Sequence, residues 1–149
     1  MKNFALRLTI VYLIIITGCS KYPDLGNGYK LDSDGRYTLQ IVNFENTIMV
    51  SSCILEYTFD SNFVILSQRP WDSIPGIKAM NYSESKKAFE KSSFRQYWII
   101  NKKDKSEYSF DSLTKLARYS NIYGPFTENE YLQKREELKI SKELVLKDK

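Results

Sequence analysis

The residue whose chemistry is easiest to assign is Cys19, because its thiol follows two small residues, Thr17 and Gly18. A free thiol is a nucleophile that can accept a lipid, and small neighbours leave room for a processing enzyme. The chain opens with two basic side chains, and an apolar run over residues 8–16 leads up to Thr17. A basic start, a short apolar stretch and small residues at its end are typical of a secretory signal peptide. The run is too short for a transmembrane helix, which needs about 20 apolar residues.

The segment Ile16-Thr17-Gly18-Cys19 resembles the lipobox that the lipoprotein signal peptidase reads. The resemblance implies a diacylglycerol thioether on the Cys19 sulfur, cleavage before Cys19 and acylation of the new amine. Acyl chains such as palmitate would hold the protein on a bilayer, since each buried CH2 contributes about 0.8 kcal/mol. Residues 1–18 would then be the signal peptide, and residues 19–27 the lipidated cysteine and a short tether. The alternative is an ordinary membrane anchor helix with an incidental cysteine.

The charge after cleavage is close to balanced. The sequence carries 22 basic and 18 acidic side chains, and removing Lys2 and Arg7 leaves 20 basic ones and a net charge of +2. This balance gives no support to nucleic-acid binding, which uses a strongly basic surface. The residue after Cys19 is Ser20 and not Asp, and an Asp at this position would resemble an inner-membrane retention signal. An outer-membrane location is therefore allowed. The expected location is therefore the extracytoplasmic side of the cell membrane or outer membrane.

The remaining thiol, Cys53, lies in an apolar run over residues 48–55. A catalytic thiolate needs a base beside it, and the sequence contains no His. The same composition argues against a zinc site and a serine hydrolase triad. We therefore expect Cys53 to be a buried free thiol, and we expect no metal or cofactor. The Asp32-Ser33-Asp34-Gly35 segment is similar to the first half of a calcium-binding loop. The third oxygen ligand and the later Glu of such a loop are not at the required spacing, so we predict a solvated turn.

Carboxylates leave one enzymatic alternative open, because a pair of them can act as acid and base on a glycoside. The conspicuous acids, Asp60, Asp72, Glu84 and Asp111, are scattered at predicted turns or caps, where such residues are expected for local reasons. We therefore predict that the chain is not an enzyme. An envelope enzyme or enzyme accessory that uses carboxylates is the alternative.

Aromatic residues point to binding. Trp71 and Arg69 lie in a loop with Pro70 and Pro75, and binding hot spots favour Trp, Tyr and Arg. These two residues are the predicted interaction surface, although a loop Trp often covers the edge of a core. The segment Tyr123–Phe126, Tyr-Gly-Pro-Phe, has a faint likeness to GYF adaptor domains, which bind Pro-rich peptides. The start of a capped helix explains the same residues.

Strands are predicted in the first part of the chain. A turn at 32–36 leads to a strand at 37–42, and a long strand is predicted over 48–59. The segment Phe63-Val64-Ile65-Leu66 is apolar on both faces, which predicts a central strand covered on both sides. A further strand is predicted at 97–100.

Helices are predicted in the C-terminal half. Residues 83–92 would bury Ala88 and Phe89, and residues 111–120 would place Leu113, Leu116 and Ala117 on one face. Asp111 can cap the second of these helices.

The last helix has the strongest signals. Thr127 and Glu130 form a capping box, and Phe126 and Tyr131 stand at the positions of a hydrophobic staple. The helix should run to about residue 138, and the apolar segment after it should dock as a tail. The elements together predict an α+β domain over residues 28–149. It has a small antiparallel sheet, helices in the C-terminal half and a capped C-terminal helix.

Short motifs follow the lipobox through the chain. They are Asp-Leu-Gly-Asn-Gly-Tyr at 24–29, Phe-Val-Ile at 63–65, Tyr-Trp-Ile-Ile-Asn-Lys-Lys at 97–103, Tyr-Gly-Pro-Phe-Thr at 123–127 and Lys-Arg-Glu-Glu-Leu at 134–138. This set resembles uncharacterised small bacterial lipoproteins that share a domain of unknown function. The segment 106–121 departs from that pattern, and we predict an inserted helix there. The resemblance implies the lipoprotein class and no catalytic residue. We therefore expect a membrane-anchored, non-catalytic binding protein, with another envelope protein as its partner.

Overall fold

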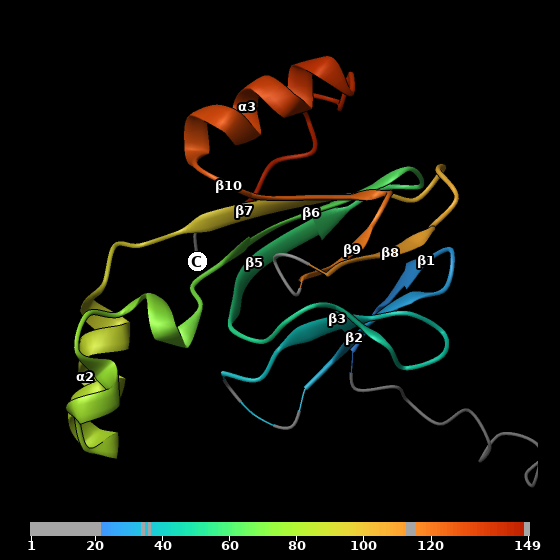
Figure 1. The fold of residues 1–149 in the computed structure, drawn as a ribbon. Helices are drawn as coiled ribbons and strands as arrows, with labels where there is room; N and C mark the ends of the chain where they lie inside the picture. The colour runs from blue at the N-terminus through green and yellow to red at the C-terminus, as the bar shows by residue number, and fades with distance from the viewer. Residues whose placement is uncertain (1–21, 34, 36, 113–115, 148–149) are drawn as a thin grey trace, which may run out of the picture.

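The computed structural model describes residues 22–147 apart from 34, 36 and 113–115 (Figure 1). The predicted signal peptide, residues 1–18, and Cys19 lie outside the described residues. Within the described part of the chain, no helix is long and apolar enough to cross a membrane.

Ten strands, two α-helices and two short 3-10 helices, η2 Trp71–Ser73 and η3 Ile77–Ala79, make up the regular structure of the described chain. All strand pairs are antiparallel. The first four strands form an N-terminal sheet, β5, β6, β7 and β10 form a central sheet, and β8 and β9 form a separate hairpin. The prediction of an α+β fold is confirmed. The bounds are β1 Asp24–Gly26, β2 Tyr29–Asp32, β3 Gln40–Val42, β4 Ile48–Val50, β5 Ile54–Phe59, β6 Phe63–Gln68, α2 Tyr82–Lys91, β7 Gln96–Asn101, β8 Tyr108–Asp111, β9 Leu116–Tyr119, β10 Ile122–Phe126 and α3 Glu128–Glu137.

The central sheet has the order β10-β7-β6-β5 and is covered on both faces. Figure 1 shows α3 on one face and the N-terminal sheet on the other. Alternate residues of β6 therefore enter different cores, with Val64 and Leu66 facing the N-terminal sheet and Ile65 facing α3. Every residue of β6 is buried. The prediction of a central strand covered on both sides is confirmed.

The core under α3 joins distant segments of the chain. Tyr131 of α3 stacks on Tyr97 of β7, with ring centroids 4.8 Å apart. Ile140 and Leu144 of the C-terminal tail are buried in the same cluster, as the sequence predicted. The capping box of Thr127 and Glu130 is present in full. This helix is held by its cap and by one buried ring more than by a broad apolar face.

Two sequence predictions are corrected by the structure. The expected long strand over 48–59 is two strands in different sheets, because the chain crosses between them at Ser51–Cys53, and Cys53 has a φ of 74°. Where a helix was expected over 111–120, the described residues belong to the β8–β9 hairpin, in which Tyr108 pairs with Tyr119. Leu113, which the prediction placed on the helix face, lies outside the described residues. Alternation of Tyr108 and Phe110 with polar residues outweighs the helical spacing there.

The folded domain also begins earlier than residue 28. Leu25, in β1, is fully buried in the core between the two sheets. Lys102, itself 7% exposed, donates hydrogen bonds from Nζ to the carbonyl oxygens of Leu25 and Asp60. Asn27 donates to the carbonyl of Lys102 at 2.9 Å. Residues 24–27 are therefore part of the domain, and the segment between Cys19 and the fold is shorter than predicted.

Helix α2 packs on a third apolar cluster, which includes Ile74 and Ile77. It begins one residue before the predicted start, with Asn81 and Glu84 forming a capping box. Phe89 is buried against Ile74 and Ile77, while Ala88 is only half-buried. The two residues predicted to be buried thus lie on the packed side of the helix.

Candidate functional site

The structure places the two predicted interaction residues beside the same ring. Trp71 stacks on Phe89, with ring centroids 4.7 Å apart, and Tyr37 lies 5.8 Å from Trp71. The Arg69 guanidinium lies over Phe89 at 5.2 Å. Trp71 is half-buried here and covers the edge of the cluster formed by α2.

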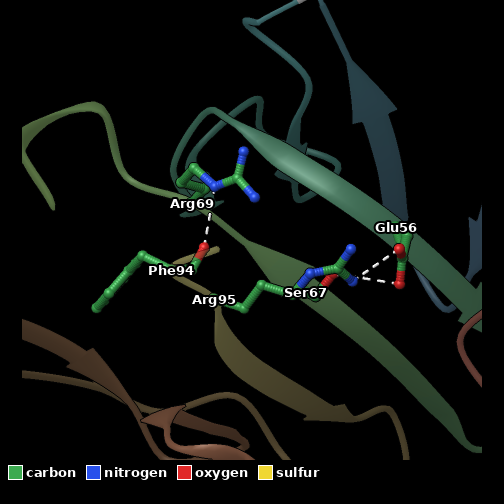
Figure 2. Close-up of polar contacts among 5 residues, drawn as sticks. All are labelled: Glu56, Ser67, Arg69, Phe94 and Arg95. Carbon is green, nitrogen blue, oxygen red and sulfur yellow. Dashed lines mark hydrogen bonds and ion pairs between the residues drawn. The ribbon is translucent and has the colours of Figure 1, made fainter. Parts of the chain in front are cut away.

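Arg69 has structural partners on two sides. Its Nε donates to the carbonyl of Phe94 at 2.9 Å (Figure 2), and its Nη1 donates to the carbonyl of Phe89 at 2.6 Å. The residue is only 8% exposed. Burial, together with the charge of Arg95, lowers the pKa of the guanidinium. Arg69 therefore joins the end of β6 to the end of α2, and the role of Arg69 and Trp71 as an interaction surface stays a prediction.

A partly buried ion pair lies close by on the central sheet (Figure 2). Arg95 Nη1 is 2.7 Å from Glu56 Oε1, and the residue Glu56 is 7% exposed. Ser67, which pairs with Glu56 across β5 and β6, lies with its hydroxyl 3.5 Å from the second carboxylate oxygen. Removal of Arg95 would leave the buried Glu56 carboxylate without its counter-charge, so this cluster holds strands together.

A recess that the sequence did not predict is a groove of about 640 Å³ along β10, an edge strand of the central sheet. It lies between α3 and the β8–β9 hairpin, and four of its twelve lining residues are aromatic. We call it the β10 groove. It is lined by Met49, Trp98, Ser109, Arg118, Tyr119, Ser120, Ile122, Tyr123, Gly124, Pro125, Phe126 and Lys134.

Gly124 shapes the floor of the β10 groove. Its φ is 131°, and the Gly124–Pro125 peptide bond is cis. A Cβ atom at this position would lie 2.7 Å from the carbonyl oxygen of Tyr97 and 2.8 Å from the ring of Trp98. Only a glycine lets the β10 backbone approach the indole so closely.

The indole of Trp98 is held by a buried amide. Its Nε1 donates to Oε1 of Gln68 at 2.7 Å, and Gln96 donates to the same oxygen at 2.8 Å. The amide nitrogen of Gln68 donates to the carbonyls of Ser51 and Ser52 at 2.8 and 2.9 Å. Gln68 therefore links the groove floor to the crossing between the two sheets.

The charges at the β10 groove are cationic. Arg118 and Lys134 are the charged residues among those that line it. Lys134 lies 4.7 Å from the centre of the Tyr123 ring and pairs with Glu137 at 2.7 Å. The Tyr123 hydroxyl donates to Asp104 at 3.3 Å. Burial, and next the charge of Asp104, raises the pKa of Tyr123.

Two parts of the β10 groove were recognised in the sequence, but not that they lie together. Tyr123–Phe126 was noticed as a helix start, and Trp98 as part of a strand. Their meeting depends on how β10 returns to pair with β7, which no local pattern encodes. The Gly-Pro pair beside two aromatic residues was the available clue.

Cys53 is a buried free thiol, as predicted, and is 7% exposed. Its Sγ donates to the carbonyl of Tyr37 at 3.1 Å. Burial raises the pKa of the thiol. Among the residues that the structure describes, no three His, Cys, Asp or Glu side chains are grouped to hold a metal ion.

The fold and groove define a small two-sheet α+β domain with an aromatic, cation-lined edge. Residues 26–149 match the family described as a protein of unknown function (DUF3997), and the chain belongs to that family. This confirms the predicted membership of a domain-of-unknown-function family, and the match begins after the predicted lipobox. The searches of curated proteins and of solved structures gave no match to this chain.

Proposed function

We propose that the protein is a lipoprotein held outside the cytoplasm by acyl chains on Cys19. The proposal rests on the order of a basic start, a short apolar run and the Ile16-Thr17-Gly18-Cys19 segment. It is tested by metabolic labelling with an alkyne analogue of palmitate. The wild type should be labelled and Cys19→Ala should not. Equal labelling of the two proteins would contradict the proposal.

We further propose that the domain binds another envelope protein without catalysing a reaction, and that the β10 groove is its binding site. The observation that carries this is the set of aromatic side chains along an edge strand, lined by cations and by no carboxylate among the described residues. The few residues that contribute most binding energy at protein interfaces are enriched in Trp, Tyr and Arg.

The form of the groove favours an extended segment of the partner. The groove follows β10, so a chain lying along it would place side chains over Trp98, Tyr123 and Phe126 in turn. Lys134 already has Glu137 as a counter-charge, whereas Arg118 is exposed at the rim. The matching segment would therefore carry an Asp or Glu next to apolar residues.

A photo-crosslinker placed in the groove tests this proposal. Tyr123 is replaced by p-benzoylphenylalanine, and the control carries the same group at Tyr82, which is 75% exposed on α2. In intact cells, position 123 should yield one crosslinked envelope protein that position 82 does not. Arg118→Glu should abolish that product, and the crosslinked peptide should contain an acid beside apolar residues. A product formed equally from both positions, or one insensitive to Arg118→Glu, would contradict the proposal.

A further inference from the structure

Phe44 is among the most exposed large apolar side chains of the described chain, yet it lies on a rigid turn. It is 74% exposed. Asn43 accepts hydrogen bonds at its Oδ1 from the backbone of Glu45 and Thr47, at 3.0 and 2.9 Å. Backbone hydrogen bonds join Asn43 to Thr47 and Asn46 to Asn43. These bonds hold the backbone of the turn between β3 and β4, which presents the Phe44 ring to solvent.

The Phe44 ring lies against the turn between β1 and β2. A Cβ atom at Gly28 would be 3.2 Å from its Cδ1. Phe44, Gly28 and Tyr22 line the same hollow of about 570 Å³. The exposed ring is therefore close to the start of the described chain.

The distance from Cys19 to Tyr22 is limited by the chain itself. Three residue steps separate them, and a fully extended chain covers about 11 Å in that number of steps. If Cys19 carries acyl chains, the hollow that Tyr22 lines stays beside the lipid headgroups. A long flexible linker, which would let the domain turn away, is missing between these two residues.

We propose that the turn between β3 and β4 rests on the bilayer, with the Phe44 ring in the interface. This inference rests on the lipidation proposed above. Ile48, which follows the same turn, is 53% exposed and adds apolar surface. Lys30, exposed beside the hollow, supplies a cation for lipid phosphates. The exposed acids Glu45, Asp24 and Asp32 keep the contact shallow.

Tryptophan quenching tests this orientation in the full lipidated protein. Phe44→Trp is compared with Leu132→Trp, a position that is 51% exposed on α3, on the other side of the central sheet. Emission from Trp71 and Trp98 is subtracted by using the wild type. Both proteins are placed in phosphatidylcholine and phosphatidylglycerol vesicles with brominated acyl chains, after mass spectrometry has established the lipid on Cys19.

The proposal expects blue-shifted emission and strong quenching at position 44, and neither at position 132. Equal quenching at both positions, or none at either, would overturn the orientation while the lipoprotein assignment stands. If mass spectrometry finds an unmodified Cys19, the lipoprotein assignment fails, and this inference fails with it. The two failures are therefore distinguished by separate measurements.

Discussion

The backbone of Gly124 lies so close to the indole of Trp98 that a Cβ atom would come within 2.8 Å of its Cε3. We expect Gly124→Ala to destabilise the domain by about 1–3 kcal/mol, because of overpacking and because an L side chain is strained at this φ of 131°. Urea unfolding followed by fluorescence measures the change. Gly35→Ala, at a site where the nearest atom is 3.9 Å away, is the control. Equal midpoints for the two variants would contradict this account.

Gln68 should be one of the most sensitive polar positions. Gln68→Leu leaves the Trp98 indole nitrogen and the Ser51 and Ser52 carbonyls without their buried partner. We expect a loss of about 2–4 kcal/mol in the free energy of unfolding, from several unsatisfied groups. Gln40→Leu, which removes one exposed contact with Asp32, should change it by less than about 0.5 kcal/mol. A similar loss in both variants would count against a special role for Gln68.

Lys102 should control how firmly β1 is attached. Lys102→Met keeps the length of the side chain but leaves the carbonyls of Leu25 and Asp60 unpaired. We expect about 1–3 kcal/mol of destabilisation and faster amide hydrogen exchange in residues 24–30. Lys103→Met, at an exposed neighbouring position, should leave exchange unchanged. Unchanged exchange in the Lys102 variant would show that β1 is held by apolar packing alone.

Cys53 should be slow to react in the folded protein. In a Cys19→Ala background it is the remaining thiol, and burial raises its pKa, so less thiolate is present at pH 8 than for a free cysteine. An aromatic disulfide reagent should modify it far more slowly before unfolding in urea than after. Equal rates in the two conditions would mean that the thiol is open to solvent.

Glu130 should make the stability of α3 depend on pH. Hydrogen bonds from the backbone and hydroxyl of Thr127 lower the pKa of Glu130 in the folded state. The stabilisation is therefore present above the unfolded pKa and is lost as the pH falls through the folded value. Thermal unfolding at pH 7 and at pH 3 should show that Glu130→Gln removes part of this dependence. Glu136→Gln, at an exposed site, should keep the wild-type dependence.

Local signals were sufficient for some elements and insufficient for others. The capping box at Thr127 and the apolar Phe63–Leu66 segment depend on neighbouring residues, and both were predicted correctly. The break at Cys53 was missed because no local pattern indicates a positive φ at a cysteine, and the neighbouring Ser52 carbonyl is bound by the distant Gln68 amide. The helix expected at 111–120 was wrong because cross-strand pairing of Tyr108 with Tyr119 outweighed the local spacing.

The candidate site was less predictable than the fold. Arg69 and Trp71 were predicted as an interaction surface because Trp and Arg are frequent at binding hot spots. In the structure, Arg69 donates hydrogen bonds to two backbone carbonyls inside the protein. The β10 groove needs Trp98, Arg118 and Lys134 from three separate elements. Their meeting follows from the order of strands in the central sheet, which depends on long-range pairing.

The position of β6 has a consequence for how the protein loses its structure. Because this one strand contributes residues to the cores on both of its sides, we expect the two cores to unfold together. Deletion of the C-terminal tail, which carries Ile140 and Leu144, should therefore lower the midpoint temperature of a single unfolding transition. No folded N-terminal part should remain above that temperature.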